Sequence, residues 1–460
     1  MSGSRFASSQ VKPQPPRPSS KPNLVLFLAD DHGYFDSPVY GDLSIRAPTL
    51  ERLARQGTVF THAFSGAAIC IPSRAIIASG LCSWRNGATA NGKQMTAGIK
   101  TLPTYLAELG YAVAHFGKSH FLPPENYQDW QAVQSEIKGE GVLNNDLDVG
   151  AVETWLDTRQ NKSQPVCLIV CCHSPHVAWQ ENEGYDPARV SLPASSVDTP
   201  ETRRMRARYL SDVTKMDTQL GRVYASVTRH LPRDTLFLYT SDNGAQWPFA
   251  KWNLYDAGIR LPMIAVWPGQ VKAGARTNAL VSFTDILPTF LEAAGGKPPS
   301  AIDGLSFLRI LTGQARRHRN EIFASHTADD NGKMNCYPMR AIHDGRYKYI
   351  RNLKPEFAYH THIDRGVERD GRSLWDSWLA AARTDAKAAA VVRRYHQRPP
   401  EELYDTVADP HETANLAERP EHATRLLALR KRVDQWMKGM NDPGEVFGTP
   451  RRLDDVKWTA

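Results

Sequence analysis

The sequence contains no long hydrophobic run. Within its 460 residues no stretch approaches the roughly 20 apolar residues that a membrane-spanning helix needs. Residues 1–22 are rich in proline and serine and contain no apolar core of the kind found in export signals. We therefore predict a disordered leader over residues 1–22 and no membrane span. The expected location is cytoplasmic as the sequence stands, and periplasmic or secreted if an export signal has been removed.

Cysteine is scarce, and its spacing matches no common pattern. The six cysteines include neither a CxxC pair nor the cysteine–histidine spacing of zinc sites. Cys167, Cys171 and Cys172 lie in or at the end of an apolar run, where a buried strand would make them small hydrophobic residues. The sequence therefore indicates no disulfide framework and argues against a metal site built from thiolates.

Neither sign of charge dominates. The 56 lysine and arginine residues exceed the 49 aspartate and glutamate residues, and the net charge of +7 is spread along the chain rather than collected in one arm. This excess suits an anionic substrate, although an ordinary basic soluble protein has the same balance. We predict no nucleic-acid partner. With 41% hydrophobic residues, a chain of this length fills one large domain and a smaller one.

Apolar runs and helical patterns alternate over most of the chain. The runs 23–29, 111–116, 166–172, 235–240 and 262–266 are typical of strands, and apolar residues recur at helical spacing in 48–56, 102–109 and 203–231. Strands that alternate with helices predict a large, mostly parallel sheet covered on both faces. The expected fold class is therefore α/β.

Near residue 340 the pattern changes. Asp344-Gly345 separates two short strand-like segments within 340–350, which is a strong hairpin signal. Segments 374–397 and 423–437 have helical character. We predict a large α/β domain over residues 23–338 and a smaller C-terminal α+β unit, with an antiparallel sheet and a helix, over residues 339–460.

The pentapeptide Cys70-Ile71-Pro72-Ser73-Arg74 is the most informative in the chain. It places Cys70 immediately before a helix that we predict over residues 72–78, with proline at its favoured first position. The positive end of the helix dipole would lower the pKa of the thiol and make Cys70 a candidate nucleophile. A buried structural cysteine before an ordinary helix would show the same local pattern.

Two acidic pairs follow predicted strands. Asp30-Asp31 comes after the first run, and Asp242-Asn243 comes after 235–240. Because the carboxyl ends of parallel strands lie at one edge of a sheet, these side chains can meet there. Three carboxylates and an amide oxygen suit Ca²⁺, with Mg²⁺ as the alternative. Each pair by itself would also fit a turn or a helix cap.

Cys-x-Pro-Ser-Arg at residues 70–74, followed by 75–80 and Arg85-Asn86-Gly87, resembles the sulfatase family over most of the chain from Asn23 onward. The resemblance implies an alkaline-phosphatase-like fold. It also implies that a formylglycine-generating enzyme oxidises Cys70 to formylglycine (3-oxoalanine), whose hydrate has one hydroxyl that attacks sulfur and another that expels sulfate. The metal ligands that it implies are Asp30, Asp31, Asp242, Asn243 and the modified Cys70.

Gly110–His120 resembles a second motif of that family. Val113 and Ser119 depart from it, because the family usually has serine or threonine and an aromatic residue at these two places, and these changes bear on packing and substrate contacts. Lys118 and His120 remain in register. The resemblance implies that Lys118 neutralises a sulfate oxygen and that His120 accepts a proton when sulfate leaves.

Three further residues have implied roles. His176, in a His-Ser-Pro-His segment after a strand, would bind sulfate and act as a general acid, although a lone histidine there is more often structural; we assign no role to His173. Lys251 matches the position of an active-site lysine or arginine, with a solvated lysine as the alternative. Arg74 would hold the formylglycine hydroxyl and the metal ligands with its guanidinium fork.

The resemblance implies a sulfuric ester hydrolase acting on sulfate monoesters or sulfamates, of a sulfated carbohydrate or an aryl sulfate. Segments 253–255, 351–353 and 402–413 are similar to the heparan N-sulfatase subgroup. A phosphonate or phosphate monoester hydrolase is the alternative enzyme, and an inactive protein that binds sulfated glycans is the alternative of another class. A two-zinc phosphatase would need more histidine and aspartate ligands. A homo-oligomer remains open.

Overall fold

The computed structural model describes residues 21–122, 126–131, 146–181, 184–231, 234–327, 334–368, 371–444 and 450–453. Residues 1–20 of the predicted leader lie outside the described residues, so that prediction is not tested. None of the helices in the described ranges combines the length and the apolar character needed to cross a bilayer.

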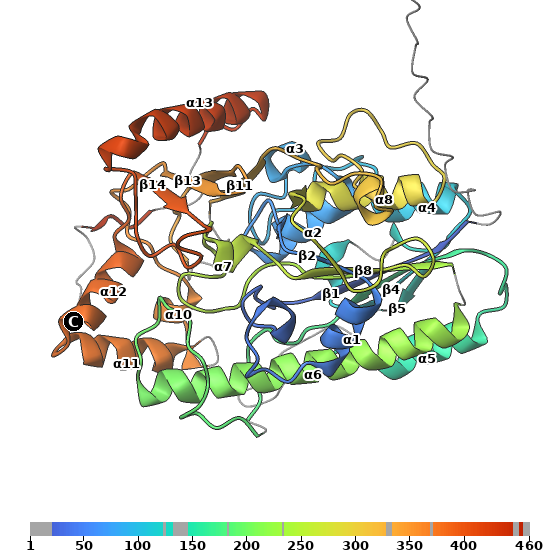
Figure 1. Cartoon of the computed structure of the whole chain (residues 1–460), viewed down its shortest axis with the longest axis horizontal. Helices are drawn as coiled ribbons and strands as arrows, with labels where there is room; N and C mark the ends of the chain where they lie inside the picture. The colour runs from blue at the N-terminus through green and yellow to red at the C-terminus, as the bar shows by residue number, and fades with distance from the viewer. Residues whose placement is uncertain are drawn as a thin grey trace, which may run out of the picture.

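An eight-stranded sheet forms the centre of the molecule (Figure 1), in the order β5-β4-β6-β1-β7-β8-β2-β9. The strands are β1 (Asn23–Ala29), β2 (Thr58–Phe60), β4 (Ala112–Gly117), β5 (Asp129–Gln131), β6 (Val166–Cys171), β7 (Thr235–Ser241), β8 (Met263–Val266) and β9 (Ala275–Thr277). Only β8 runs antiparallel to its neighbours among these described strands. The predicted α/β class and mostly parallel sheet are confirmed.

Helices cover both faces of this sheet. In Figure 1, α2 (Cys70–Ser79), α4 (Leu102–Glu108) and α8 (Ile286–Ala293) lie above it, and α1 (Pro48–Gln56), α5 (Val149–Thr158) and α6 (Pro200–His230) lie below. Val25 and Phe27 of β1 belong to one core cluster, while Leu24 and Leu26 belong to the other. Strand β1 is apolar along its whole length because both of its faces are buried.

A second sheet lies in the C-terminal part of the chain, on the left of Figure 1. Its antiparallel order is β11 (Ile322–His326), β12 (Met339–His343), β13 (Tyr347–Asn352) and β14 (Glu401–Asp405). The predicted hairpin is β12–β13, which turns at Gly345 with a φ of 97°. Helix α13 (Ala423–Gly439) packs on this sheet through Leu426, Leu429 and Val433. The sheet begins ahead of the division that we predicted at residues 338–339.

The segment predicted as helical over 374–397 forms two helices. They are α11 (Arg372–Ala382) and α12 (Ala386–His396), and the side chain of Asp385 caps α12 by accepting a hydrogen bond from the Lys387 N–H. An aspartate that bonds the following backbone starts a new helix here, which the alanine-rich composition concealed.

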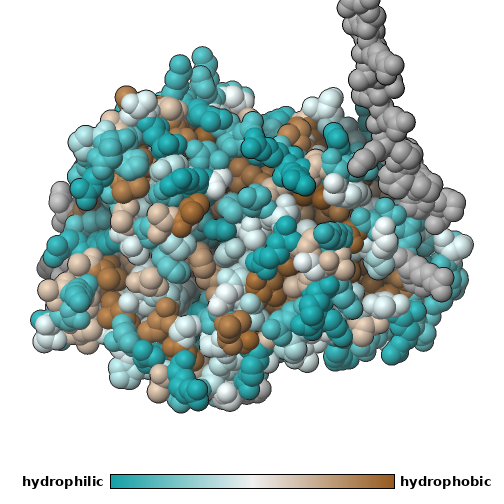
Figure 2. Space-filling model, in the orientation of Figure 1, coloured by the Kyte–Doolittle hydropathy of each residue, from teal (hydrophilic) through white to brown (hydrophobic). Residues whose placement is uncertain are grey.

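The remaining elements are short. They are the 3₁₀ turns η1 (Pro38–Tyr40), η2 (Ser119–Phe121), η4 (Phe283–Asp285) and η6 (Pro420–His422), the helices α3 (Ser83–Asn86), α7 (Asp256–Ile259), α9 (Leu308–Leu311) and α10 (His362–Arg365), and the strands β3 (Ala63–Phe64) and β10 (Val281–Ser282). On the face in Figure 2, hydrophobic residues are scattered among hydrophilic ones. The predicted homo-oligomer stays a prediction.

Candidate active site

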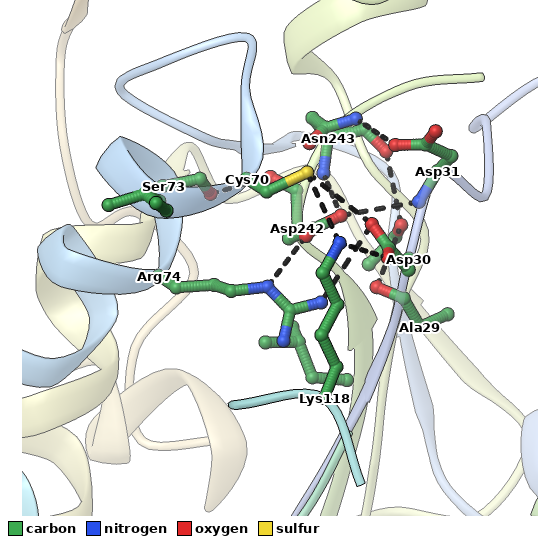
Figure 3. A network of polar contacts seen from close by, with 12 residues as sticks. Ala29, Asp30, Asp31, Cys70, Ser73, Arg74, Lys118, Asp242 and Asn243 are labelled. Carbon is green, nitrogen blue, oxygen red and sulfur yellow. Dashed lines mark hydrogen bonds and ion pairs between the residues drawn. The ribbon is translucent and has the colours of Figure 1, made fainter. Parts of the chain in front are cut away.

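The two acidic pairs meet at the carboxyl edge of the central sheet (Figure 3). Asp30 and Asp31 follow β1, and Asp242 and Asn243 follow β7. Strands β1 and β7 pair in parallel with Ala29 opposite Ser241, and the Asp242 N–H donates to the Ala29 carbonyl at 3.1 Å. All four side chains are fully buried. The parallel register therefore brings together carboxylates that lie over 200 residues apart.

Cys70 reaches this edge from the first turn of α2. Its Sγ lies 3.5 Å from Asp30 Oδ1 and 3.5 Å from Lys118 Nζ. The helix begins at Cys70 rather than at Pro72 as predicted; proline, which has no N–H to donate, is tolerated throughout the first turn. The hydroxyl of Ser73 ties this turn to β7 by donating to the Asp242 carbonyl at 2.5 Å.

The predicted lowering of the Cys70 pKa is wrong. The side chain is 2% exposed, and burial raises the pKa of the thiol well above its usual value, against the attraction of Lys118 and Lys251. Removal from water outweighs the helix dipole here. The unmodified thiol is therefore poorly suited to act as a thiolate at neutral pH.

Three buried cations face the three carboxylates. Lys118 Nζ donates to Asp30, and Lys251 Nζ donates to Asp31 Oδ2 at 2.8 Å. Arg74 Nε donates to Asp242 Oδ2 at 2.7 Å, while its Nη2 lies 3.9 Å from Asp30. Arg74 thus bridges two carboxylates instead of forming a two-bonded fork with one. The formal charges balance, so a divalent cation would leave the site positive and ready for an anion.

Lys118 is aimed by the glycine that precedes it. Gly117 ends β4 with a φ of 87°, and a β-carbon there would lie 1.9 Å from the Cys171 carbonyl oxygen. The Lys118 N–H donates to that same carbonyl at 2.8 Å. Glycine is needed at this position both for the left-handed backbone and for the close approach of β6.

The pKa values of the three buried carboxylates shift in different directions. Although burial opposes ionisation, the charges of Lys118 and Arg74 hold the pKa of Asp30 well below its usual range. Burial, assisted by the charges of Asp30 and Asp242, raises the pKa of Asp31 to about 7 despite Lys251. Burial also raises the pKa of Asp242. A further positive charge at the site would favour the ionised forms of Asp31 and Asp242.

The donor set fits a hard divalent cation. Asn243 Nδ2 donates to Asp31 Oδ1 at 2.6 Å and to the Gly244 carbonyl at 2.9 Å, while its buried Oδ1 has no hydrogen-bond partner among the described residues. Asp31 has a φ of 66°, a strained conformation for a non-glycine residue. Asp30, Asp31, Cys70 and His176 offer ligand atoms within 4.8 Å of one another. Crowded carboxylates beside an orphaned amide oxygen suit Ca²⁺ or Mg²⁺.

Two histidines lie against the carboxylates from the segment after β6. His176 Nδ1–H donates to the Val177 carbonyl at 2.5 Å, and its Nε2 lies 3.8 Å from Asp31 Oδ2. Burial lowers the pKa of His176 well below its usual value, so the ring is neutral. His173 Nδ1 lies 3.7 Å from Asp30 Oδ2. Sequence reasoning missed His173; its one signal was the position three residues before His176.

His120 is the predicted site residue that stands apart. It lies in η2, its side chain is exposed, and no described residue forms a hydrogen bond or an ion pair with its ring. The structure therefore brings together nine predicted residues and leaves His120 at the edge. The nine are Asp30, Asp31, Cys70, Arg74, Lys118, His176, Asp242, Asn243 and Lys251.

Comparisons with known proteins identify the family of this chain. The model of the family described as sulfatase matches residues 22–296, and the model described as N-sulphoglucosamine sulphohydrolase, C-terminal, matches residues 244–365. The chain is 32% identical to an ulvan-active sulfatase of Formosa agariphila, over 92% of this chain and 81% of that protein. It is 28% identical to human N-sulphoglucosamine sulphohydrolase, over 92% and 91% of the two chains.

Among solved structures, a phosphonate monoester hydrolase from Silicibacter pomeroyi superposes with a TM-score of 0.68 at 18% identity, covering 95% of this chain and all of that one. A likeness at this identity shows the shared alkaline-phosphatase-like fold alone. The sequence matches carry the family. This chain belongs to the sulfatase family of sulfuric ester hydrolases, in the subgroup that has an N-sulphoglucosamine sulphohydrolase C-terminal region.

Proposed function

We propose that this sulfatase hydrolyses sulfate monoesters or sulfamates on a sulfated sugar, with formylglycine made from Cys70 as its nucleophile and Ca²⁺ as its metal. The observation that carries the proposal is the place of Cys70, whose Sγ lies 3.5 Å from Lys118 Nζ and 3.5 Å from Asp30 Oδ1 in a carboxylate cluster. The raised pKa of the thiol supports a modified residue rather than a thiolate.

The donor atoms of the cluster support a particular set of metal ligands. Asp30, Asp31, Asp242, the Asn243 amide oxygen and the modified residue 70 would hold the ion, with Mg²⁺ as the alternative. Bound there, it would stabilise negative charge on the nucleophile and on a sulfate oxygen. The hydrated aldehyde would supply the attacking hydroxyl and a second hydroxyl whose deprotonation releases sulfate.

The chain's own residues would bind the sulfo group and move protons. Lys118 and Lys251 reach the cluster from two different segments of the chain. Each would neutralise an oxygen of the sulfo group as a point charge. His176 Nε2 faces the cluster as a proton acceptor in the free enzyme. The negative charge of a bound sulfo group would raise the His176 pKa and let it protonate the leaving oxygen or nitrogen. His120 would take the proton from the second hydroxyl.

A sulfated carbohydrate is the substrate class that the relatives favour, and a sulfated amino sugar is the member of that class that we propose. The two named relatives act on ulvan and on N-sulphoglucosamine, and the C-terminal match is of the second kind. N-sulfoglucosamine is therefore the first probe and an aryl sulfate the second. Maturation would require a formylglycine-generating enzyme as a partner.

Two alternatives remain testable. A phosphonate monoester hydrolase shares the fold, and its substrate is also a tetrahedral anion. A binding protein for sulfated glycans would result if Cys70 were never modified. The 32% identity to a named sulfatase, over 92% of this chain, favours a sulfatase over both alternatives.

The test is sulfate release from N-sulfoglucosamine and from an aryl sulfate, with and without a chelator. We expect release by the wild-type enzyme, loss in Cys70→Ala, and recovery of the chelated enzyme with Ca²⁺. Cys82→Ala, which changes a partly exposed cysteine outside the cluster, should retain activity. Turnover of a phosphonate monoester without sulfate release would overturn the proposal.

A further inference from the structure

A cavity of about 620 Å³ begins beside two residues of the active site. Ile71, which follows Cys70, and Ser119, which follows Lys118, both line it. This volume lies within the ~300–1,000 Å³ that small-molecule sites typically have. The proposed mechanism uses the cluster at Cys70 and leaves this cavity without a role.

Small side chains make the cavity, and hydrogen bonds fix its wall. Ala75 and Ala88 line it together with the loop 94–99. The Ile71 N–H donates to Asn91 Oδ1 at 3.0 Å, and the Thr96 N–H donates to the Asn86 carbonyl at 2.8 Å. The first turn of α2 is thus tied to Asn91, and the loop is tied to Asn86 at the end of α3, so both bonds hold the cavity wall near Cys70.

An aromatic side chain forms part of the wall of this cavity. The half-buried Trp130 lines the cavity, and His115 stacks on its indole with a centroid distance of 4.6 Å and an interplanar angle of 7°. Tyr127 lies at 5.0 Å from the same indole. These contacts hold Trp130 in one orientation. A fixed aromatic surface with a few polar groups around it is the usual lining of a site for a small ligand.

His120 lines the cavity at the edge of the cluster, where the charges of Lys118, Arg74 and Asp30 act on it. Its exposed side chain lines the cavity, although Lys118, two residues earlier, points to Cys70 and Asp30. A molecule with an anionic group at the cluster and its body in the cavity would therefore pass His120. Gln94 and Ser119 add polar side chains to the same lining.

We propose that this cavity binds the sugar ring of the substrate while the Cys70 cluster binds its sulfo group. The inference rests on the proposed function and adds to it the place of the sugar. It makes Trp130 the surface against which the ring packs, and it makes Ser119 a specificity-determining residue, because a large side chain there would fill part of the cavity.

The test uses two variants that change the cavity in opposite ways. Ser119→Trp fills part of the cavity, and Trp130→Ala removes its aromatic wall. We expect each to raise the KM for N-sulfoglucosamine about tenfold or more, while the inhibition constant of inorganic sulfate, which needs the cluster alone, stays within about twofold. Ala273→Trp, at an exposed turn outside the cavity, is the matched control and should leave both constants unchanged.

Each contrary result has a definite meaning. A KM within about twofold of the wild-type value in both variants would overturn the assignment of the sugar to this cavity. Weakening of sulfate inhibition by the same factor as the KM would also overturn it, because the cluster would then be the part affected. Absence of sulfate release by the wild-type enzyme would overturn the proposed function, and the cavity assignment with it.

Discussion

Asp31 lies in a left-handed backbone conformation between two other buried carboxylates, and burial with their charges raises its pKa to about 7. In the unfolded chain this carboxyl has its ordinary pKa near 3.8. The folded protein therefore favours the protonated form, and the stability that this proton contributes is complete below pH 3.8 and lost as the pH rises through about 7. A cation at the site needs the opposite, ionised form.

We expect Ca²⁺ binding to tighten with pH and to release protons near pH 7. Calcium should accordingly raise the melting temperature more at pH 8 than at pH 6. Titration calorimetry in two buffers with different ionisation heats measures the number of protons released on binding. Asp31→Asn is the control, because its side chain has no proton to release near pH 7. A calcium affinity that does not change with pH would contradict this account.

Arg74 is the residue whose geometry is hardest to replace. Its guanidinium contacts Asp242 and approaches Asp30, which a lysine ammonium cannot do at both places. We predict that Arg74→Lys loses about 3 kcal/mol of stability and tenfold or more in kcat, since the buried Asp242 carboxylate loses the guanidinium that donates to it. Denaturant melts and steady-state rates measure the two effects.

Arg430→Lys is the matched comparison. Arg430 pairs with Glu401 at the surface through two hydrogen bonds, and replacing it should cost less than about 1 kcal/mol. Equal effects of the two substitutions would show that the Arg74 bridge has no special importance.

At the residue scale, motifs predicted most of the cluster and local physics predicted little of its electrostatics. Cys70, Lys118 and Lys251 were found because each matches a family motif. The Cys70 pKa was predicted with the wrong sign, because burial depends on the packing of distant segments and not on the neighbouring helix end. His173 was left without a role because one histidine after a strand carries no pattern of its own.

At the scale of elements, α2 shows how a helix is fixed to a sheet. The Ser73 hydroxyl accepts a hydrogen bond from Ser65 at 2.8 Å and donates one to the Asp242 carbonyl. This chain of bonds sets the distance between Cys70, at the start of α2, and the carboxylates at the end of β7. The catalytic geometry therefore depends on a serine that does not touch the substrate.

We predict that Ser73→Ala lowers stability by about 1–3 kcal/mol, because it removes the hydroxyl that donates to the buried Asp242 carbonyl. The kcat should fall while formylglycine formation persists, since the first turn of α2 is released from β7. Thermal melts, rates and peptide masses measure these effects. Thr218→Ala, which removes an exposed hydroxyl bonded to the Thr214 carbonyl, should change none of them; an equal loss there would count against the role of Ser73.

Long elements could be predicted from the sequence, and short ones could not. Strand β1 and helix α1 have the predicted bounds because a buried strand and an amphipathic helix each leave a clear hydrophobic pattern. Strands β2, β5 and β9 have three residues each, too few to show any alternation. They form because neighbouring strands supply their hydrogen bonds. Those neighbours come from other parts of the chain, so the local sequence does not predict them.

At the scale of the whole molecule, the C-terminal region holds the segment that carries Lys251. Arg398 Nη2 donates to Asn253 Oδ1 at 3.0 Å, and the Tyr359 hydroxyl donates to the Trp252 carbonyl at 3.2 Å. The fully buried Lys348 of β13 pairs with Asp256 and lies 3.0 Å from Glu412. No spacing rule relates such distant residues, so the sequence could not predict this contact.

Removing the charge of Lys348 should therefore weaken both the fold and the site. We expect Lys348→Met to cost about 3–5 kcal/mol, since it leaves the buried Glu412 without its cation and Asp256 with Arg260 alone. The KM should also rise as Lys251 loses its support. Denaturant unfolding and kinetics measure these effects, with Lys387→Met on the exposed face of α12 as the control. A Lys348→Met protein as stable as this control would contradict the role of the buried cation.

The central claim is that residue 70 acts as formylglycine, and the mass of the tryptic peptide spanning residues 56–74 in an active preparation tests it most directly. The account predicts the fixed mass loss that converts cysteine to formylglycine, in a fraction that rises in proportion to sulfate release across preparations. Full sulfatase activity in a preparation whose residue 70 is entirely unmodified cysteine would contradict it.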